Sequence, residues 1–435
     1  MLDFYSLAAC VVCVVVCASL RFALQVPRAA GTRDMYDGGI MLLQLCGDLL
    51  LLPYYAIFPY TKCEIFRGKG ATAWHIPSLR SYPATFWLRN QWICWIYEVG
   101  ILTLLPENRK AVRRELVSIE GGGVCALDWF TAGDDLPEDA PVCFFAPTLI
   151  GGGRERTTLA LAGELKGWRC VCFVNRGGGM ADPLELPDWT PPALVDYDLT
   201  LFGLELVRAR YPRSFLAIAG NSTGGCWVRR YCASSAQSNL ADAAFAMDGG
   251  WCCEATVRTV HAMNPLMARI FGDTVAGPLL KSTQGDPPSW LDIANLRRVA
   301  HSSWLDVVDA AHRRHAKAST VHEYFKMTMD RPEIMPPSQS SSIPTLVMAT
   351  LSDAIGNDTY WTDTCSGGNL PLANVPDNFI ICLNSRGCHG FRTTGWAGRS
   401  SWAGKVALQF FEAVRCSRNN GSLVSRDRKR KIEMQ

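Results

Sequence analysis

A short apolar run that leads into a glycine-flanked serine and then a helical pattern constrains this chain more than any other feature. The segment FLAIAGNSTGGCWVRRY begins at Phe215 and places Ser222 between Gly220 and Gly224. A serine on a strained strand-to-helix turn exposes its hydroxyl, and glycines two residues away on either side let the strand and helix approach closely. The pattern predicts a nucleophile at Ser222. The alternative is a glycine-rich turn whose serine only caps the helix.

A nucleophilic serine of this kind needs a base and an orienting carboxylate, which follow it along the chain in the order acid, then histidine. His389 follows the strand-like apolar run that ends at Leu383 and is the only histidine after His322. Asp353 lies just beyond another apolar run, where catalytic groups gather in open α/β sheets, and Asp358 is the reserve candidate. We expect Ser222, Asp353 and His389 to form a catalytic triad.

Short apolar runs alternate with helical patterns, which predicts an α/β fold with a mostly parallel, eight-stranded sheet flanked by helices. The expected strands are residues 115–119, 124–130, 142–146, 170–174, 215–218, 243–247, 345–349 and 378–383. The expected helices are residues 155–166, 195–210, 224–234 and 403–414. Residues from about 251 to 342 are helical and strandless in pattern, and we expect a cap there that shapes the substrate pocket.

The length of 435 residues suits one large α/β domain with an anchor. We expect residues 1–60 to be an N-terminal membrane anchor region, 61–85 a linker, 86–415 the α/β domain and 416–435 a basic, disordered tail. The tail contains the run RDRKRK. Such a run is most often solvated, although it also fits contact with anionic lipid or a localisation signal.

Two apolar stretches lie within the anchor region. Residues 4–20 carry no charge and reach the lower limit for a bilayer span. Asp3 precedes this stretch and Arg21 follows it, which favours a retained anchor over a signal peptide. Residues 40–58 contain Asp48 and Pro53, so the anchor is either a single pass or a hairpin. We expect a membrane location, for which the endoplasmic reticulum is one option. A single pass and a hairpin would place the α/β domain on opposite sides of that membrane.

The cysteines indicate neither a metal site nor a disulfide framework. Cys143, Cys170, Cys172 and Cys382 fall within expected core strands, where a thiol acts as a small hydrophobe. No C-x-x-C pair has a partner pair, so we expect no metal and no cofactor. The net charge of +3 identifies no partner, and we expect none among nucleic acids. The 48% apolar content favours contact with a membrane.

Three other motifs compete with this interpretation and carry less weight. Asn221-Ser-Thr223 is formally a glycosylation sequon, but a buried turn could not be glycosylated. His301 and Asp306 have the H-x4-D spacing seen in acyltransferases, which arises easily by chance. Arg176 follows an expected strand, and we expect it to have a structural role in a turn.

Together these residues resemble the α/β-hydrolase domain family four, which includes membrane-anchored eukaryotic lipases and bacterial YheT-type esterases. The resemblance extends from about Phe86 to Val414. It implies the α/β-hydrolase fold with the helical cap and N-terminal membrane segment expected above. It rests on Arg113-Arg-Glu-Leu116, Ala126-Leu-Asp-Trp129, Asn175-Arg-Gly177, Asp198-Leu199, Arg210-Tyr-Pro212, Gly220-Asn-Ser-Thr-Gly-Gly225, Val321-His-Glu-Tyr-Phe325, Ile343-Pro344 leading to Asp353, and His389-Gly-Phe391.

The resemblance maps the family's triad onto the same Ser222, Asp353 and His389. It also implies an oxyanion hole formed by the backbone N–H groups of Thr223 and Leu149. One departure concerns the loop that holds Leu149. The family has His-Gly before that residue, whereas this chain has Pro147-Thr148.

Anchor, cap and resemblance together predict a serine esterase or lipase that acts on a monoacylglycerol, a phospholipid or a medium-chain fatty-acyl ester. The expected partners are this lipid substrate and the membrane, and the sequence indicates no oligomeric state. An acyltransferase would use the same acyl-enzyme and differ only in the second step. A non-catalytic membrane scaffold that keeps the fold is the remaining alternative.

Overall fold

The structure is a computed structural model, and it describes most of the chain beyond residue 60. The described residues are 51, 56, 60–90, 93–94, 97–98, 112–119, 124–130, 136–148, 152, 155–175, 197–234, 240–249, 268–269, 272–273, 275–277, 280, 289–329, 343–351, 375–395 and 398–433. Apart from residues 51 and 56, the two expected membrane stretches lie outside them, and so does Asp353. Among the described residues no helix combines the length and apolar character needed to cross a bilayer.

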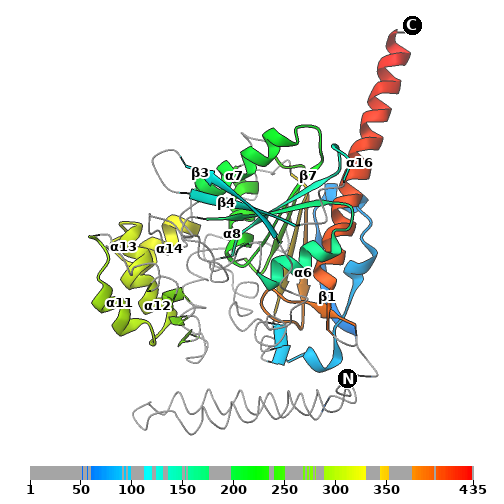
Figure 1. Ribbon diagram of the computed structural model, residues 1–435. Helices are drawn as coiled ribbons and strands as arrows, with labels where there is room; N and C mark the ends of the chain where they lie inside the picture. Colours follow the sequence, from blue (N-terminus) through cyan, green and yellow to red (C-terminus); the bar gives the residue numbers. More distant parts are fainter. Residues whose placement is uncertain are drawn as a thin grey trace.

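Ten strands form one sheet (Figure 1), so the expected number of eight is wrong. All eight expected strands are present, and two more precede them. The strands are β1 (Tyr60–Arg67), β2 (Ser81–Pro83), β3 (Val112–Ser118), β4 (Val124–Phe130), β5 (Val142–Ala146), β6 (Arg169–Val174), β7 (Leu216–Asn221), β8 (Ala243–Met247), β9 (Thr345–Thr350) and β10 (Phe379–Asn384). The short strands β11 (Thr393–Thr394) and β12 (Ser400–Ser401) pair separately.

The additional strands β1 and β2 lie in the stretch expected to be a linker. β1 pairs antiparallel with β10, with Ile65 opposite Cys382, and β2 pairs antiparallel with β1. Cys63 and Ile65 pack on the core, while Lys62 and Glu64 point the other way and form an ion pair. Charged residues are common near the edge of a sheet, and here they obscured the apolar alternation that would mark a strand.

The order of the sheet is β2-β1-β10-β9-β8-β7-β5-β6-β4-β3. The six central strands from β10 to β6 are parallel, and the four at the two edges are antiparallel to their neighbours. The sheet is therefore mixed. Read from β3, the order β3-β4-β6-β5-β7-β8-β9-β10, with β4 antiparallel to both neighbours, is that of the α/β-hydrolase fold. The α/β-hydrolase fold and the mostly parallel sheet that the sequence predicts are confirmed.

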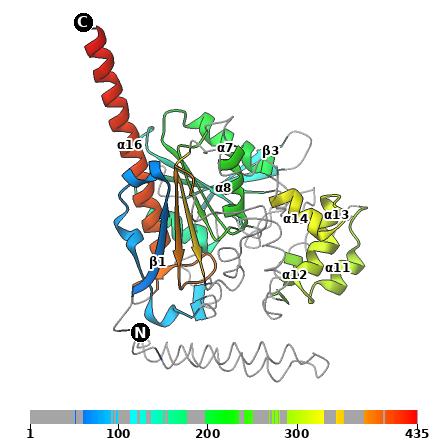
Figure 2. The ribbon, with the colours of Figure 1, turned by 180° about the vertical axis from the view of Figure 1, so that it is seen from behind.

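Helices cover both faces of this sheet (Figures 1 and 2). On one face α6 (Arg156–Glu164) and α16 (Trp402–Glu433) pack through Leu161, Trp402 and Phe410. On the other face α7 (Tyr197–Arg210) and α8 (Thr223–Ser234) pack through Leu204, Val228 and other apolar residues. The central strands are buried on both sides, which explains why they appear in the sequence as uninterrupted apolar runs.

The terminal helix α16 is longer than the expected 403–414. It runs along the sheet and then projects beyond the domain (Figure 1). It includes most of the stretch expected to be a disordered tail. Short helical turns lie between β1 and β3 at η1 (Lys69–Ala73), η2 (Pro77–Arg80) and η3 (Phe86–Leu88).

The described residues between β8 and β9 are helical, as the sequence predicts. They form α11 (Ile293–Val299), α12 (Trp304–Val307), the π-helical turn η8 (Val308–His312), α13 (Arg313–His315) and α14 (Val321–Met329). These helices have an apolar core of their own that includes Trp304 and Phe325. In both views they lie on the opposite side of the sheet from α16 (Figures 1 and 2). Cys226 of α8 packs against this core, which brings the insertion close to Ser222.

Candidate active site

Ser222 occupies the turn between β7 and α8, the strand-to-helix context that the sequence predicts. Its φ of +55° lies in the left-handed region, which is uncommon for a non-glycine residue and is typical of a strained turn. Its N–H donates to the carbonyl of Met247 over 2.9 Å, and its carbonyl accepts from the N–H of Cys226 over 3.0 Å. The backbone around Ser222 is therefore fixed both to the neighbouring strand β8 and to the first turn of α8.

The glycines around Ser222 are required by close backbone approach. A Cβ at Gly220 would lie 2.2 Å from the carbonyl oxygen of Gly224. A Cβ at Gly224 would lie 2.4 Å from the carbonyl oxygen of Ala146. Both distances are too short for a real side chain, so the structure supports the steric reason that the sequence pattern suggests.

The loop after β5, which is expected to supply part of an oxyanion hole, meets the start of α8. A Cβ at Gly224 would be 3.0 Å from the carbonyl oxygen of Pro147, so this loop touches the turn that holds Ser222. Thr148 is buried there. Thr223 is the first residue of α8, and amides at a helix N-terminus suit a developing negative charge. Leu149, the other expected donor, lies outside the described residues.

His389 lies in the loop after β10, and this loop packs on the residue before Ser222. A Cβ at Gly390 would be 2.5 Å from Nδ2 of Asn221 and 3.2 Å from Oγ1 of Thr157. Gly390 has φ of +78°, so only glycine fits easily on both counts. The loop brings His389 and Ser222 to the same edge of the sheet, and both side chains are partly exposed.

Asp353 and its reserve Asp358 lie outside the described residues. The strand before them, β9, ends at Thr350 beside the ends of β8 and β10. The assignment of the orienting carboxylate to Asp353 thus stays a prediction. It agrees with the position of β9 between the strands that lead to Asp248 and to His389.

Asp248 is a site residue that the sequence analysis missed. It follows β8, has φ of +48° and has a fully buried side chain. Its Oδ2 accepts from the N–H of Gly390 over 2.7 Å, and Arg392 donates to both carboxylate oxygens over 2.7 and 2.6 Å. Burial alone would raise the pKa of Asp248, but the charge and hydrogen bonds of Arg392 outweigh burial and lower it. The available signal was an aspartate directly after an apolar run, as for Asp353.

Glu155 is a second acidic group that the sequence analysis did not single out. It immediately precedes α6, and Thr158 donates to its carboxylate over 3.4 Å. Burial raises the pKa of Glu155 to about 7, against the opposing effects of the nearby Thr148 and Thr158 hydroxyls and of the charge on His389. The site thus brings a titrating carboxyl group close to the imidazole.

The structure also bears on the competing motifs. Asn221 is 6% exposed at the end of β7, so it is not accessible for glycosylation. His301 contacts Asp273 at 2.7 Å, whereas Asp306 accepts from Ser303 at 2.8 Å, so the H-x4-D pair does not form. Arg176 lies outside the described residues.

The cysteines expected in core strands are buried, free thiols. They are Cys143, Cys170, Cys172 and Cys382. Burial raises the pKa of the Cys143 and Cys170 thiols. Within the part of the chain that the structure describes, no three His, Cys, Asp or Glu side chains form a group that could hold a metal ion.

Comparison with known proteins adds to this picture. No family model matches the chain. A curated relative, the embryogenesis-associated protein EMB8 of Picea glauca, is 31% identical over 129 residues, and the match covers 27% of this chain and 27% of that protein. The chain thus matches about a quarter of the length of that relative.

Several solved structures of hydrolases are similar to this chain, and one of them is described as a member of the α/β-hydrolase superfamily. A membrane phospholipase A described as a bacterial virulence factor is 16% identical, with a TM-score of 0.42, over 74% of this chain and 94% of that one. A fungal esterase of Rhizomucor miehei is 12% identical, with a TM-score of 0.42, over 71% and 84%. An epoxide hydrolase from hot-environment metagenomes is 17% identical, with a TM-score of 0.37, over 64% and 93%. These likenesses concern the fold.

Proposed function

We propose that the protein is a serine hydrolase that cleaves carboxylic esters through an acyl-enzyme on Ser222. The observation that carries the proposal is the strained, glycine-enclosed turn at Ser222 with the His389 loop packed against Asn221. His389 would remove the Ser222 proton as the hydroxyl attacks the ester carbonyl. Asp353 would orient the imidazole and stabilise the imidazolium.

The negative charge of the tetrahedral intermediate would develop next to the N-terminus of α8. The N–H groups of Thr223 and Leu149 would donate to it there. Collapse of the intermediate would transfer the His389 proton to the leaving alcohol, and water, activated by the same imidazole, would release the acid. This sequence of steps requires no metal or organic cofactor.

The proposed substrate is a lipid ester, such as a monoacylglycerol, a phospholipid or a medium-chain fatty-acyl ester. Support comes from the two apolar stretches in the first 60 residues and from the apolar helical insertion next to α8. A membrane location would supply such a substrate from the bilayer. An acyltransferase would differ only in using an alcohol, rather than water, to resolve the acyl-enzyme.

Labelling of the full chain with a fluorophosphonate probe tests this proposal. We expect the wild type to be labelled and Ser222→Ala to be inert. Ser214→Ala is the matched control, because Ser214 lies just before β7 and its hydroxyl donates to the carbonyl of Glu138 over 3.3 Å. A folded wild type that resists the probe would contradict the proposal and favour a non-catalytic scaffold.

Esters of increasing acyl length then define the substrate. We expect hydrolysis of p-nitrophenyl esters to rise from acetyl to medium-chain acyl groups. Adding glycerol as an acceptor and separating the products distinguishes hydrolysis from acyl transfer, since a transferase would yield acylglycerol instead of free acid.

A further inference from the structure

Two consecutive residues at the end of β8 accept backbone hydrogen bonds from the turn that holds Ser222 and from the loop that holds His389. The carbonyl of Met247 accepts the N–H of Ser222 over 2.9 Å, and the carboxylate of Asp248 accepts the N–H of Gly390, next to His389, over 2.7 Å. The nucleophile turn and the histidine loop are thus attached to neighbouring positions of one strand end. A small displacement there would change the distance between Ser222 and His389.

Arg392, which follows His389 in the same loop, completes this attachment by binding the carboxylate of Asp248. Its Nη1 and Nη2 donate to the two carboxylate oxygens, and its Nε donates to Oδ1 of Asn384, the last residue of β10, over 3.0 Å. The Thr350 N–H at the end of β9 also donates to Asp248, over 3.2 Å. Asp248 therefore receives hydrogen bonds from the ends of β9 and of the loop after β10.

Both side chains of this ion pair are fully buried. Transferring two charges from water to the protein interior has a large desolvation cost, and apolar residues of similar size at the same positions often make the fold equally stable or more stable. A stability argument alone therefore does not account for such a pair at the catalytic edge of the sheet. The pair also places one negative and one positive charge near the imidazole, with no net charge between them.

From this geometry we propose that Asp248 and Arg392 form a positioning pair, which holds His389 in register with Ser222 and balances the charge around the imidazole. The inference rests on the proposed serine-hydrolase function and adds residues to its site. Asp248 itself is saturated by Arg392, Gly390 and Thr350, so it orients the loop and leaves the role of imidazole partner to Asp353.

The charge balance has a signature that a purely structural role would not produce. The charged groups around His389 in the described part of the chain include Asp248 at the end of β8, Glu155 before α6 and Arg392 on its own loop. Asp248→Asn would leave the arginine charge uncompensated and disfavour the imidazolium. Arg392→Gln would leave the aspartate charge uncompensated and favour the imidazolium. The two variants should move the pKa of His389 in opposite directions, by about one pH unit each.

NMR titration of ¹³C-labelled histidine in the full-length chain measures this pKa without relying on turnover. The His389 signal is assigned by its loss in His389→Gln. We expect the pKa to fall in Asp248→Asn, to rise in Arg392→Gln and to return near the wild-type value in the double variant D248N/R392Q. Asp242→Asn, at the other end of β8, is the matched control and should leave it unchanged.

The rate of fluorophosphonate labelling gives the second measurement. We expect the double variant to label about tenfold more slowly than wild type, because the charge-assisted hydrogen bonds that hold the loop are replaced by weaker ones. Equal pKa values of His389 in all folded variants, or shifts in the same direction, would overturn the proposal. If the single variants do not fold, a folded double variant that labels at the wild-type rate would overturn it as well. A wild type that is not labelled would contradict the hydrolase function. The NMR titration of His389 in the variants would then still test whether Asp248 and Arg392 balance the charge around the imidazole.

Discussion

Asn221 and Gly390 are in such close contact that no side chain fits at position 390: a Cβ on Gly390 would lie 2.5 Å from the side-chain nitrogen Nδ2 of Asn221. These two residues precede Ser222 and follow His389, respectively. Their contact is what brings the candidate nucleophile and base together, although the two loops are far apart in the sequence.

Gly390→Ala should therefore slow fluorophosphonate labelling at least tenfold and lower stability by about 2–3 kcal/mol, the sum of left-handed backbone strain and overpacking. Labelling kinetics and urea unfolding measure the two effects. Gly395→Ala is the control, since Gly395 has φ of +83° with no atom within 4 Å of its Cβ position. That variant should lose about 1 kcal/mol from backbone strain and keep its labelling rate. Equal labelling of both variants would show that the contact with Asn221 does not matter.

Gly203→Ala should destabilise the domain by about 1–3 kcal/mol, because overpacking exceeds the gain in helix propensity. Gly203 lies within α7, and a Cβ there would be 2.4 Å from Cδ2 of Phe173 in the core. Urea unfolding measures the change. Gly163→Ala in α6 is the matched control, because nothing lies within 4 Å of its Cβ position, and it should stabilise by up to about 1 kcal/mol. A stabilising Gly203→Ala would mean that Phe173 moves aside at little cost.

Two carboxyl groups should make stability depend on pH below neutrality. Burial raises the pKa of Glu98 to about 7 despite the nearby charge of Arg156, and burial raises that of Glu155 to about 7 as well. Between pH 4.5 and 7 the folded state then holds more protons than the unfolded chain, so these groups stabilise the fold at low pH and lose that contribution as pH rises. The melting temperature of Glu98→Gln, measured across this window, should rise relative to that of wild type as pH increases.

Other groups titrate in the same window, so the informative quantity is the difference between each variant and wild type. Glu155→Gln should show a smaller gain than Glu98→Gln, because Glu98 is fully buried and Glu155 is partly exposed. A constant difference in melting temperature across pH would show that neither carboxyl group titrates there.

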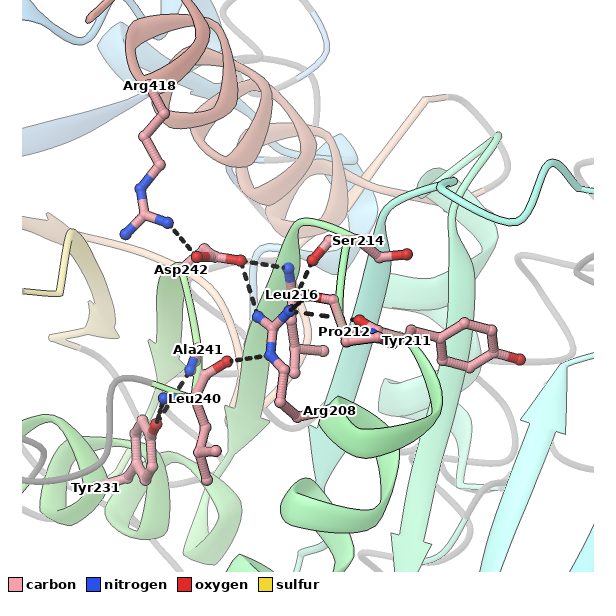
Figure 3. Close-up of polar contacts among 10 residues, drawn as sticks. All are labelled: Arg208, Tyr211, Pro212, Ser214, Leu216, Tyr231, Leu240, Ala241, Asp242 and Arg418. Carbon is pink, nitrogen blue, oxygen red and sulfur yellow. Dashed lines mark hydrogen bonds and ion pairs between the residues drawn. The ribbon is translucent and has the colours of Figure 1, made fainter. Parts of the chain in front are cut away.

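The arginines around Asp242 should differ in their contribution to stability (Figure 3). Arg208 donates to Asp242 and to the carbonyls of Leu240 and Ser214 over 2.8 to 2.9 Å, and its side chain is mostly buried. Arg418 reaches Asp242 from α16 with a half-exposed side chain. Arg208→Ala should cost about 3 kcal/mol because it leaves buried acceptors unpaired, whereas Arg418→Ala should cost less than about 1 kcal/mol. Chemical denaturation of the two variants checks the ranking, and a larger loss in Arg418→Ala would reverse it.

The positions of the central strands in the sequence and the turn at Ser222 could be predicted because both depend on local sequence. Buried parallel strands are uninterrupted apolar runs, and the spacing of Gly220 and Gly224 around Ser222 is a local pattern, although Gly224 also approaches Ala146. Asp248 could not be assigned in the same way. Its role depends on Arg392, which lies 144 residues further along the chain, and no periodicity indicates such a pairing.

The ends of the sheet were harder to predict for a different reason. β1 carries charges on its outward face and β2 has only three residues, so neither has the apolar pattern of a core strand. The position of Glu155 next to His389 likewise results from the packing of α6 against the sheet. Tertiary contacts, rather than local preference, determine these features.

The pairing of β1 with β10 also determines how a shortened version of this protein should be made. A fragment that starts at Phe86, where the family resemblance begins, would lose β1 and β2 and leave the backbone of β10 open to intermolecular strand addition. It would also lose the hydrogen bonds from Thr394 to Pro83 and from Tyr82 to Thr393, which secure the segment just after the histidine loop. A fragment for crystallisation should therefore begin before Tyr60, so that it keeps both strands.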